Sequence, residues 1–89
     1  MGVYWQVAKQ GQRLMLADGE RKERIGGVRV TPRGFDAFAL TFSYQPERAQ
    51  RDIASMDEAK AFVESFKPWE LFVNAPEISV DHAVRLLDE

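Results

Sequence analysis

The sequence contains no cysteine and only one histidine, His82. The lack of cysteine excludes disulfides, thiol chemistry and zinc–thiolate sites within these 89 residues. His82 has Ser79 and Asp81 as sequence neighbours, but a catalytic triad needs groups that converge in space. The spacings typical of metal ligands, of a P-loop or of a dinucleotide-binding loop do not occur. We therefore expect no enzyme activity, no metal site and no cofactor.

Long hydrophobic runs are also missing. The longest apolar stretches, 37–40 and 71–73, are too short to cross a bilayer, and no apolar signal-peptide segment follows Met1. The composition, with 45% hydrophobic and 29% charged residues, is instead typical of a globular chain. We expect a single domain over 1–89 and a cytoplasmic location.

Each half of the chain is poor in charge of one sign. Residues 1–51 contain nine Lys or Arg and five Asp or Glu, a net charge of +4. Residues 52–89 contain three Lys or Arg and nine Asp or Glu, a net charge of −6. Such asymmetry can indicate a charged partner, and it also fits two halves that offset each other in the fold.

Alternating apolar residues over 1–44 predict four antiparallel strands joined by short turns. Two-residue turns are predicted at Gln10-Gly11 and at Asp18-Gly19. The first of these turns pairs Val7 with Leu14, so that apolar residues meet on the face that should become the core.

The third and fourth strands need two adjustments to keep their apolar residues on that face. A β-bulge at Gly26-Gly27 would bring Ile25 and Val28 to the same side. A three-residue turn with Gly34 in the left-handed conformation would pair Val28 with Phe38. The fourth strand, 35–44, would then direct four side chains to the core, namely Phe38, Leu40, Phe42 and Tyr44.

Two capped amphipathic helices are predicted after the strands, at 55–67 and at 79–88. Ser55 and Glu58 have the spacing of a capping box. The apolar stripe of the first helix is Met56, Ala59, Phe62, Val63 and Phe66. The conformation of 69–76 is left open between a strand, a helical turn and a packed loop. The expected fold is α+β, a four-stranded antiparallel meander with one face covered by two C-terminal helices.

The sheet face that the helices leave uncovered is the first candidate binding surface. A solvated face is tolerated in an antiparallel sheet, but Arg, Tyr and Met are enriched at protein interfaces. The candidate partner-binding residues on this face are Tyr4, Arg13, Met15, Arg24 and Arg29. The neighbouring segment "GERKER", 19–24, is typical of a solvated hairpin end that protects a sheet edge.

The second candidate surface is the acidic side of the helices, with Asp57, Glu64 and Asp81. Carboxylates there could meet a basic groove of a partner and gain on-rate from electrostatic steering.

The strand order followed by "IASMDEAKAFVESF" resembles small phage and prophage proteins, and the element order is similar to one class of anti-CRISPR inhibitors. In sequence, the resemblance depends on Ile53, Ser55, Glu58, Ala59 and Lys60. It implies a small phage or mobile-element protein that binds and inhibits a host protein complex, such as a CRISPR–Cas complex, in the bacterial cytoplasm. It implies no catalysis and transfers no functional residue.

Nucleic-acid binding by the basic sheet face is the main alternative. Basic residues beside an aromatic are what a single-strand platform uses, but Tyr4 would be the only aromatic there, and the pI of about 5.4 opposes it. A structural role or a homodimer is the third alternative.

Overall fold

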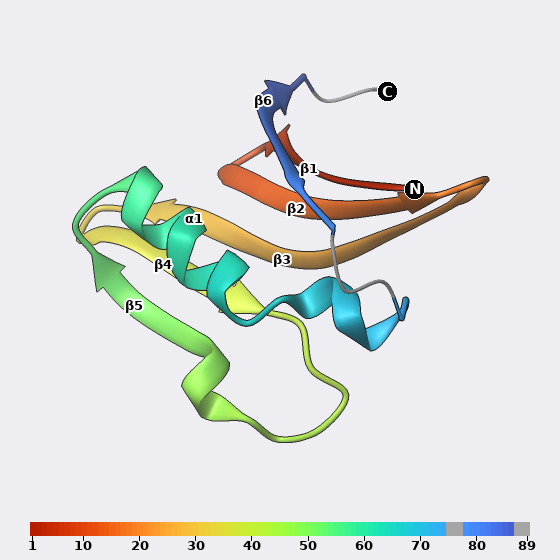
Figure 1. The fold of residues 1–89 in the computed structure, drawn as a ribbon. Coiled ribbons are helices and arrows are strands. Elements are labelled where there is room, and N and C mark those ends of the chain that lie inside the picture. Colours follow the sequence, from red (N-terminus) through yellow and green to blue (C-terminus); the bar gives the residue numbers. More distant parts are fainter. Residues whose placement is uncertain (75–77, 87–89) are drawn as a thin grey trace.

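The computed structural model describes residues 1–74 and 78–86, which form an α+β fold built on a six-stranded mixed sheet (Figure 1). The strand order is β5-β4-β3-β2-β1-β6, and β3 runs from beside α1 to the far hairpin tip. The strands are β1 Gly2–Ala8, β2 Gly11–Asp18, β3 Arg21–Thr31, β4 Gly34–Ala39, β5 Ala49–Ile53 and β6 Val80–Arg85. The helical elements are η1 Pro46–Arg48, α1 Met56–Ser65 and η2 Pro68–Leu71.

Helix α1 covers one face of β3 and β4, as the sequence predicts for the first helix. The Ser55 side chain accepts a hydrogen bond from the Glu58 backbone N–H at 3.1 Å, which confirms the predicted cap. Ala59 and Val63 are fully buried, and the rest of the stripe, Met56, Phe62 and Phe66, packs partly buried against the same core. Trp5, Leu14, Leu16 and Ile25 form the sheet side of this core.

The first two hairpins are present, but each register differs from the prediction by two residues. The first turn is at Lys9-Gln10, so Trp5 rather than Val7 lies opposite Leu14. The second turn is at Gly19-Glu20. Because side chains alternate with a period of two, a two-residue shift leaves every residue on its predicted face.

The β-bulge in β3 is confirmed, with Ile25 as the extra residue, one position before the predicted glycine pair. The three-residue turn with Gly34 is wrong: Pro32-Arg33 form a two-residue turn, and Val28 lies opposite Ala37. Phe38 therefore points away from α1 and is 37% exposed.

Close packing of the helix explains this register. A Cβ on Gly26 would lie only 2.5 Å from Cγ1 of Val63, so α1 rests almost directly on the β3 backbone. A phenyl ring in place of Ala37 or Ala39 would occupy the volume of the helix, whereas these two small side chains fit beneath it, both buried.

The fourth strand is shorter than predicted and is followed by a strand that the sequence did not predict. β4 ends at Ala39, and Phe42 and Tyr44 are exposed rather than buried. The polar connection 45–54 contains η1 and β5, which pairs with β4. Four of the five side chains of β5 are exposed, so the strand lacks the apolar alternation that would have revealed it.

The predicted second helix is wrong. Residues 80–85 form β6, which runs parallel to β1 and pairs Val3 with Val80 and Gln6 with Arg85. A strand here satisfies the backbone groups at the free edge of β1, which a helix would leave unpaired. Positions 87 and 88 of the predicted helix lie outside the described residues, as do 75 and 76 of the open segment 69–76. The described part of that segment contains most of η2, a short helical turn.

Candidate binding groove

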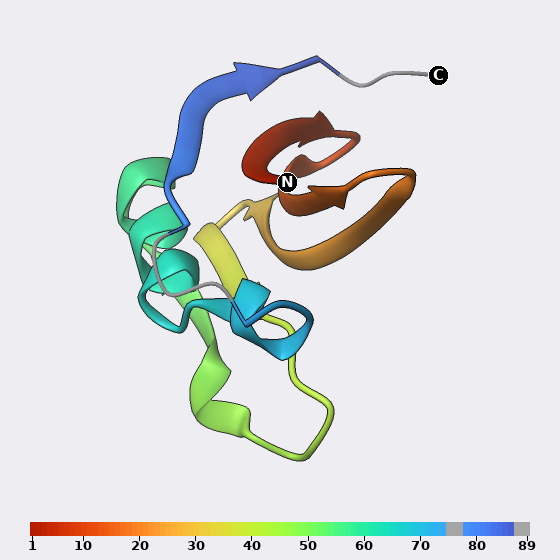
Figure 2. The same ribbon diagram turned by 45° about the vertical axis from the view of Figure 1, so that its right-hand side comes forward.

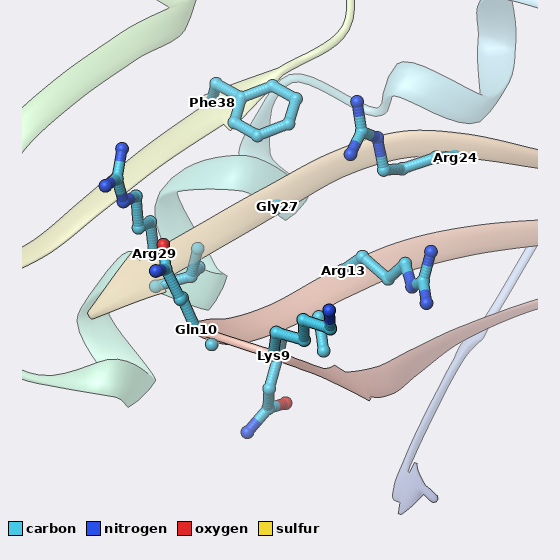
Figure 3. Close-up of a pocket in the computed structure, with 11 residues that line it drawn as sticks. Lys9, Gln10, Arg13, Arg24, Gly27, Arg29 and Phe38 are labelled. Carbon is cyan, nitrogen blue, oxygen red and sulfur yellow. The ribbon is translucent and has the colours of Figure 1, made fainter. Parts of the chain in front are cut away.

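A groove of about 450 Å³ lies on the sheet face opposite α1 (Figure 3). Its cationic side chains come from the first turn and from β2 and β3, and they are Lys9, Arg13, Arg24 and Arg29. Its floor and apolar wall are formed by Ala8, Gly11, Gly27, Val28 and Phe38. The sequence prediction placed three of these cations on the open face, and the structure brings all three to one groove.

The strand registers explain why the cations converge. Arg24 lies opposite Met15, Gly27 lies opposite Arg13, and Arg29 lies opposite Gly11, so the open-face side chains alternate between β2 and β3. The bulge at Ile25 keeps Arg24 on the same side as Arg29 despite their odd separation. The sheet is strongly twisted, and β3 bends along its length (Figure 2).

Phe38 adds an aromatic wall that the sequence reasoning missed, because it placed this ring in the core. A Cβ on Gly27 would lie 2.9 Å from Cε1 of Phe38, so the ring leans over the bare backbone of β3. The Arg24 guanidinium carbon lies 5.7 Å from the centre of the same ring, within the range of a cation–π contact. The two-residue turn after β3 sets the register that places Phe38 on this face.

The acidic residues near these cations do not enter the groove. Glu23 alternates with Lys22 and Arg24 and lies on the opposite face. Asp36 accepts a hydrogen bond from the Asp52 backbone N–H at 3.1 Å, so its carboxylate is directed to β5. None of the described residues that line the groove is acidic. The carboxylate of Asp36 lies outside this lining, although Asp36 is the partner of Arg29 in the register between β3 and β4.

Tyr4 and Met15 lie on the same face as the groove, yet neither is available as a contact residue. Tyr4 is 4% exposed and Met15 is 9% exposed. The guanidinium carbon of Arg85 lies 3.8 Å from the centre of the Tyr4 ring and covers it. Because the sequence predicted a helix in place of β6, it gave no sign of this cover. Ala37 and Ala39, which the predicted register of the fourth strand would place on this face, lie in the core.

The second candidate surface does not form a single patch. Glu64 accepts a hydrogen bond from the Trp5 indole N–H at 3.0 Å, and its other oxygen lies 3.3 Å from Nε2 of His82. Asp57 lies beside Glu64 in a small pocket, but Asp81 contacts Arg85 at 3.7 Å in β6. Glu64 is thus a structural residue, and reversal of its charge would remove both contacts.

Comparisons with protein-family models, with curated proteins and with solved structures find no match to this chain. Within 1–74 and 78–86, no three His, Asp or Glu side chains gather in a way that could hold a metal ion. None of the helices in the described part of the chain is long and apolar enough to span a membrane. The geometry of the groove is therefore the feature from which a function can be inferred.

Proposed function

We propose that this is a non-catalytic binding protein that holds an acidic surface of a partner protein in the basic groove. The observation that carries this proposal is the convergence of Lys9, Arg13, Arg24 and Arg29 on one concave site whose described lining contains no acid. An Arg can form paired hydrogen bonds with a carboxylate, and stacking of Arg24 on Phe38 pre-organises one guanidinium for this role.

Nucleic acid is the second candidate, and the exposed ring of Phe38 beside Arg24 favours it. Two features favour a protein instead. Single-strand binders stack successive bases on several aromatics along a basic track, whereas here the Tyr4 ring is covered and Phe38 is the only aromatic that lines the described groove. The chain also has a net charge of −2, which opposes a long polyanion beyond the groove.

Pairing of sheet edges between two copies is a weaker explanation. The edge strand β5 is interrupted at Asp52, which has a φ of 58°. The other edge strand, β6, is irregular. Tyr4 and Gln6 have one residue between them in β1, but their partners Asp81 and Arg85 have three residues between them. Irregular edges disfavour continuation of the sheet into another chain, so the open face is the better candidate surface.

The resemblance in sequence to small phage proteins, which depends on the residues around the Ser55 cap, supports a more specific form of the proposal. The similarity to anti-CRISPR inhibitors depended on an order of four strands and two helices, which differs from the order in the structure. The partner would then be a host protein complex, and occupation of its acidic surface by this small domain would block the complex. No chemical step is needed, because steric exclusion alone is sufficient for inhibition.

Capture from a nuclease-treated bacterial lysate tests the proposal. We expect the wild-type protein to retain a partner that quantitative mass spectrometry detects. Arg24→Glu should reduce its recovery at least tenfold, because the exposed Arg24 lines the groove. Lys67→Glu is the matched control, since Lys67 is an exposed cation beyond the end of α1 and outside the groove.

Two outcomes would contradict the proposal. Equal recovery with both variants would show that the groove is not the binding surface. Nucleic acid would be favoured by two results together. The first is that proteins captured from an untreated lysate are all lost on nuclease treatment. The second is that the pure protein forms a nanomolar complex with an oligonucleotide at physiological salt. Affinity for nucleic acid would also fall steeply with added salt.

A further inference from the structure

We infer that the groove binds an extended segment of the partner that carries acidic side chains at alternate positions. This inference rests on the proposed function and specifies its ligand. It follows from the relative positions of Arg24, Arg13 and Arg29 in the sheet, which the registers between β2 and β3 define.

The three arginines form a shallow triangle with a regular spacing. Arg24 and Arg29 lie opposite Met15 and Gly11, which are four residues apart in β2. A strand rises about 3.3 Å per residue, so the two arginines start about 13 Å apart along β3. Arg13 lies opposite Gly27, midway between them and one strand away, at about 7–8 Å from each.

An extended chain matches this spacing. Its alternate side chains point to one side and are about 6.6 Å apart, so acids at positions i, i+2 and i+4 span about 13 Å. Three consecutive acids in an extended chain would direct one or two of their carboxylates away from the groove. In a helix, acids at i, i+4 and i+8 would have a similar spacing of about 6 Å, so a helical ligand needs nine residues where an extended ligand needs five.

The shape of the groove also fits such a segment. It is open, and its volume of about 450 Å³ holds several side chains. Phe38 forms one wall at mid-length, beside Gly27, where the methylene groups of a glutamate can pack against the ring (Figure 3). The carboxylates at the two ends then face Arg24 and Arg29, and the central carboxylate faces Arg13.

Two synthetic peptides of equal composition test the inference, Thr-Glu-Thr-Glu-Thr-Glu-Thr and Thr-Thr-Glu-Glu-Glu-Thr-Thr. Each is titrated at low salt into the isotope-labelled protein and into Arg13→Ala, and dissociation constants are taken from amide chemical shifts. We expect the alternating peptide to bind five- to tenfold more tightly. Arg13→Ala should reduce that preference to less than twofold, because the central contact is lost.

The two peptides could bind with equal affinity, shift the amide signals of the groove and bind Arg13→Ala more weakly. That result would overturn the alternating pattern but leave the proposed function intact. The absence of groove shifts with either peptide would count against both. Tighter binding of a four-nucleotide oligothymidylate than of the alternating peptide would assign the groove to nucleic acid. The amide spectrum of Arg13→Ala shows whether that variant keeps the fold.

Discussion

Replacement of Trp5 by alanine is expected to reduce the free energy of unfolding by about 3–5 kcal/mol. Trp5 is 0% exposed and belongs to the hydrophobic core. Its loss leaves a large cavity and also removes the indole N–H that binds the Glu64 carboxylate at 3.0 Å. Urea unfolding followed by circular dichroism measures the effect, which approaches the whole stability of many small domains.

Phe42→Ala is the matched control for this prediction. Phe42 is also a large aromatic, but its side chain is 70% exposed and contacts Phe72 only at the ring edge. We expect a cost below about 1 kcal/mol for its removal. Similar costs for the two variants would show that Trp5 is not part of the buried core.

Gly11→Ala is expected to affect both the fold and the groove. A Cβ at this position would lie 1.9 Å from the backbone oxygen of Val28, so β2 and β3 must separate there. Because the contact is with backbone, no side-chain movement can relieve it, and we expect a loss of about 3 kcal/mol or more. Gly11 lies opposite Arg29, so the variant should also weaken binding of the alternating peptide.

Gly2→Ala provides the comparison for the glycine variant. No atom lies within 4 Å of the position that its Cβ would occupy, and we expect a change within about 0.5 kcal/mol. Equal unfolding midpoints for the two alanine variants would mean that β2 and β3 are not in close contact at Gly11.

The sequence predicts the parts of the fold that repeat a clear pattern. The first two hairpins, the bulge in β3 and the Ser55 cap of α1 follow from alternation and capping residues, and all are present. The turn after β3 was misjudged because the pattern of apolar residues cannot show that Gly26 lies against Val63. That contact is long-range in sequence, and it decides which face receives Phe38.

The C-terminal half was harder to predict because its strands depend on partners distant in sequence. β5 is polar, and β6 has apolar residues at helical spacing, yet both pair with edges of the meander. Pairing with β1 decides the conformation of β6 against its local pattern, as tertiary contacts often do.

The sequence predicts only part of the candidate site, because the rest depends on contacts between residues distant in sequence. Alternation within β2 and β3, together with the predicted bulge between Arg24 and Arg29, places Arg13, Arg24 and Arg29 on one face, and the structure brings them to one groove. It could not reveal that Phe38 would join them or that Arg85 would cover Tyr4, because both follow from the contacts of β4 and β6.

Calorimetric titration tests most directly whether the basic groove is the binding surface. It uses the partner protein that is captured from the nuclease-treated lysate. The partner is titrated into the wild-type protein, Arg29→Glu and Asp57→Lys, after circular dichroism has shown that both variants are folded. We expect Arg29→Glu to weaken binding at least a hundredfold and Asp57→Lys to change it less than threefold. Loss of binding with Asp57→Lys alone would contradict the account and assign the partner to the acidic side of α1.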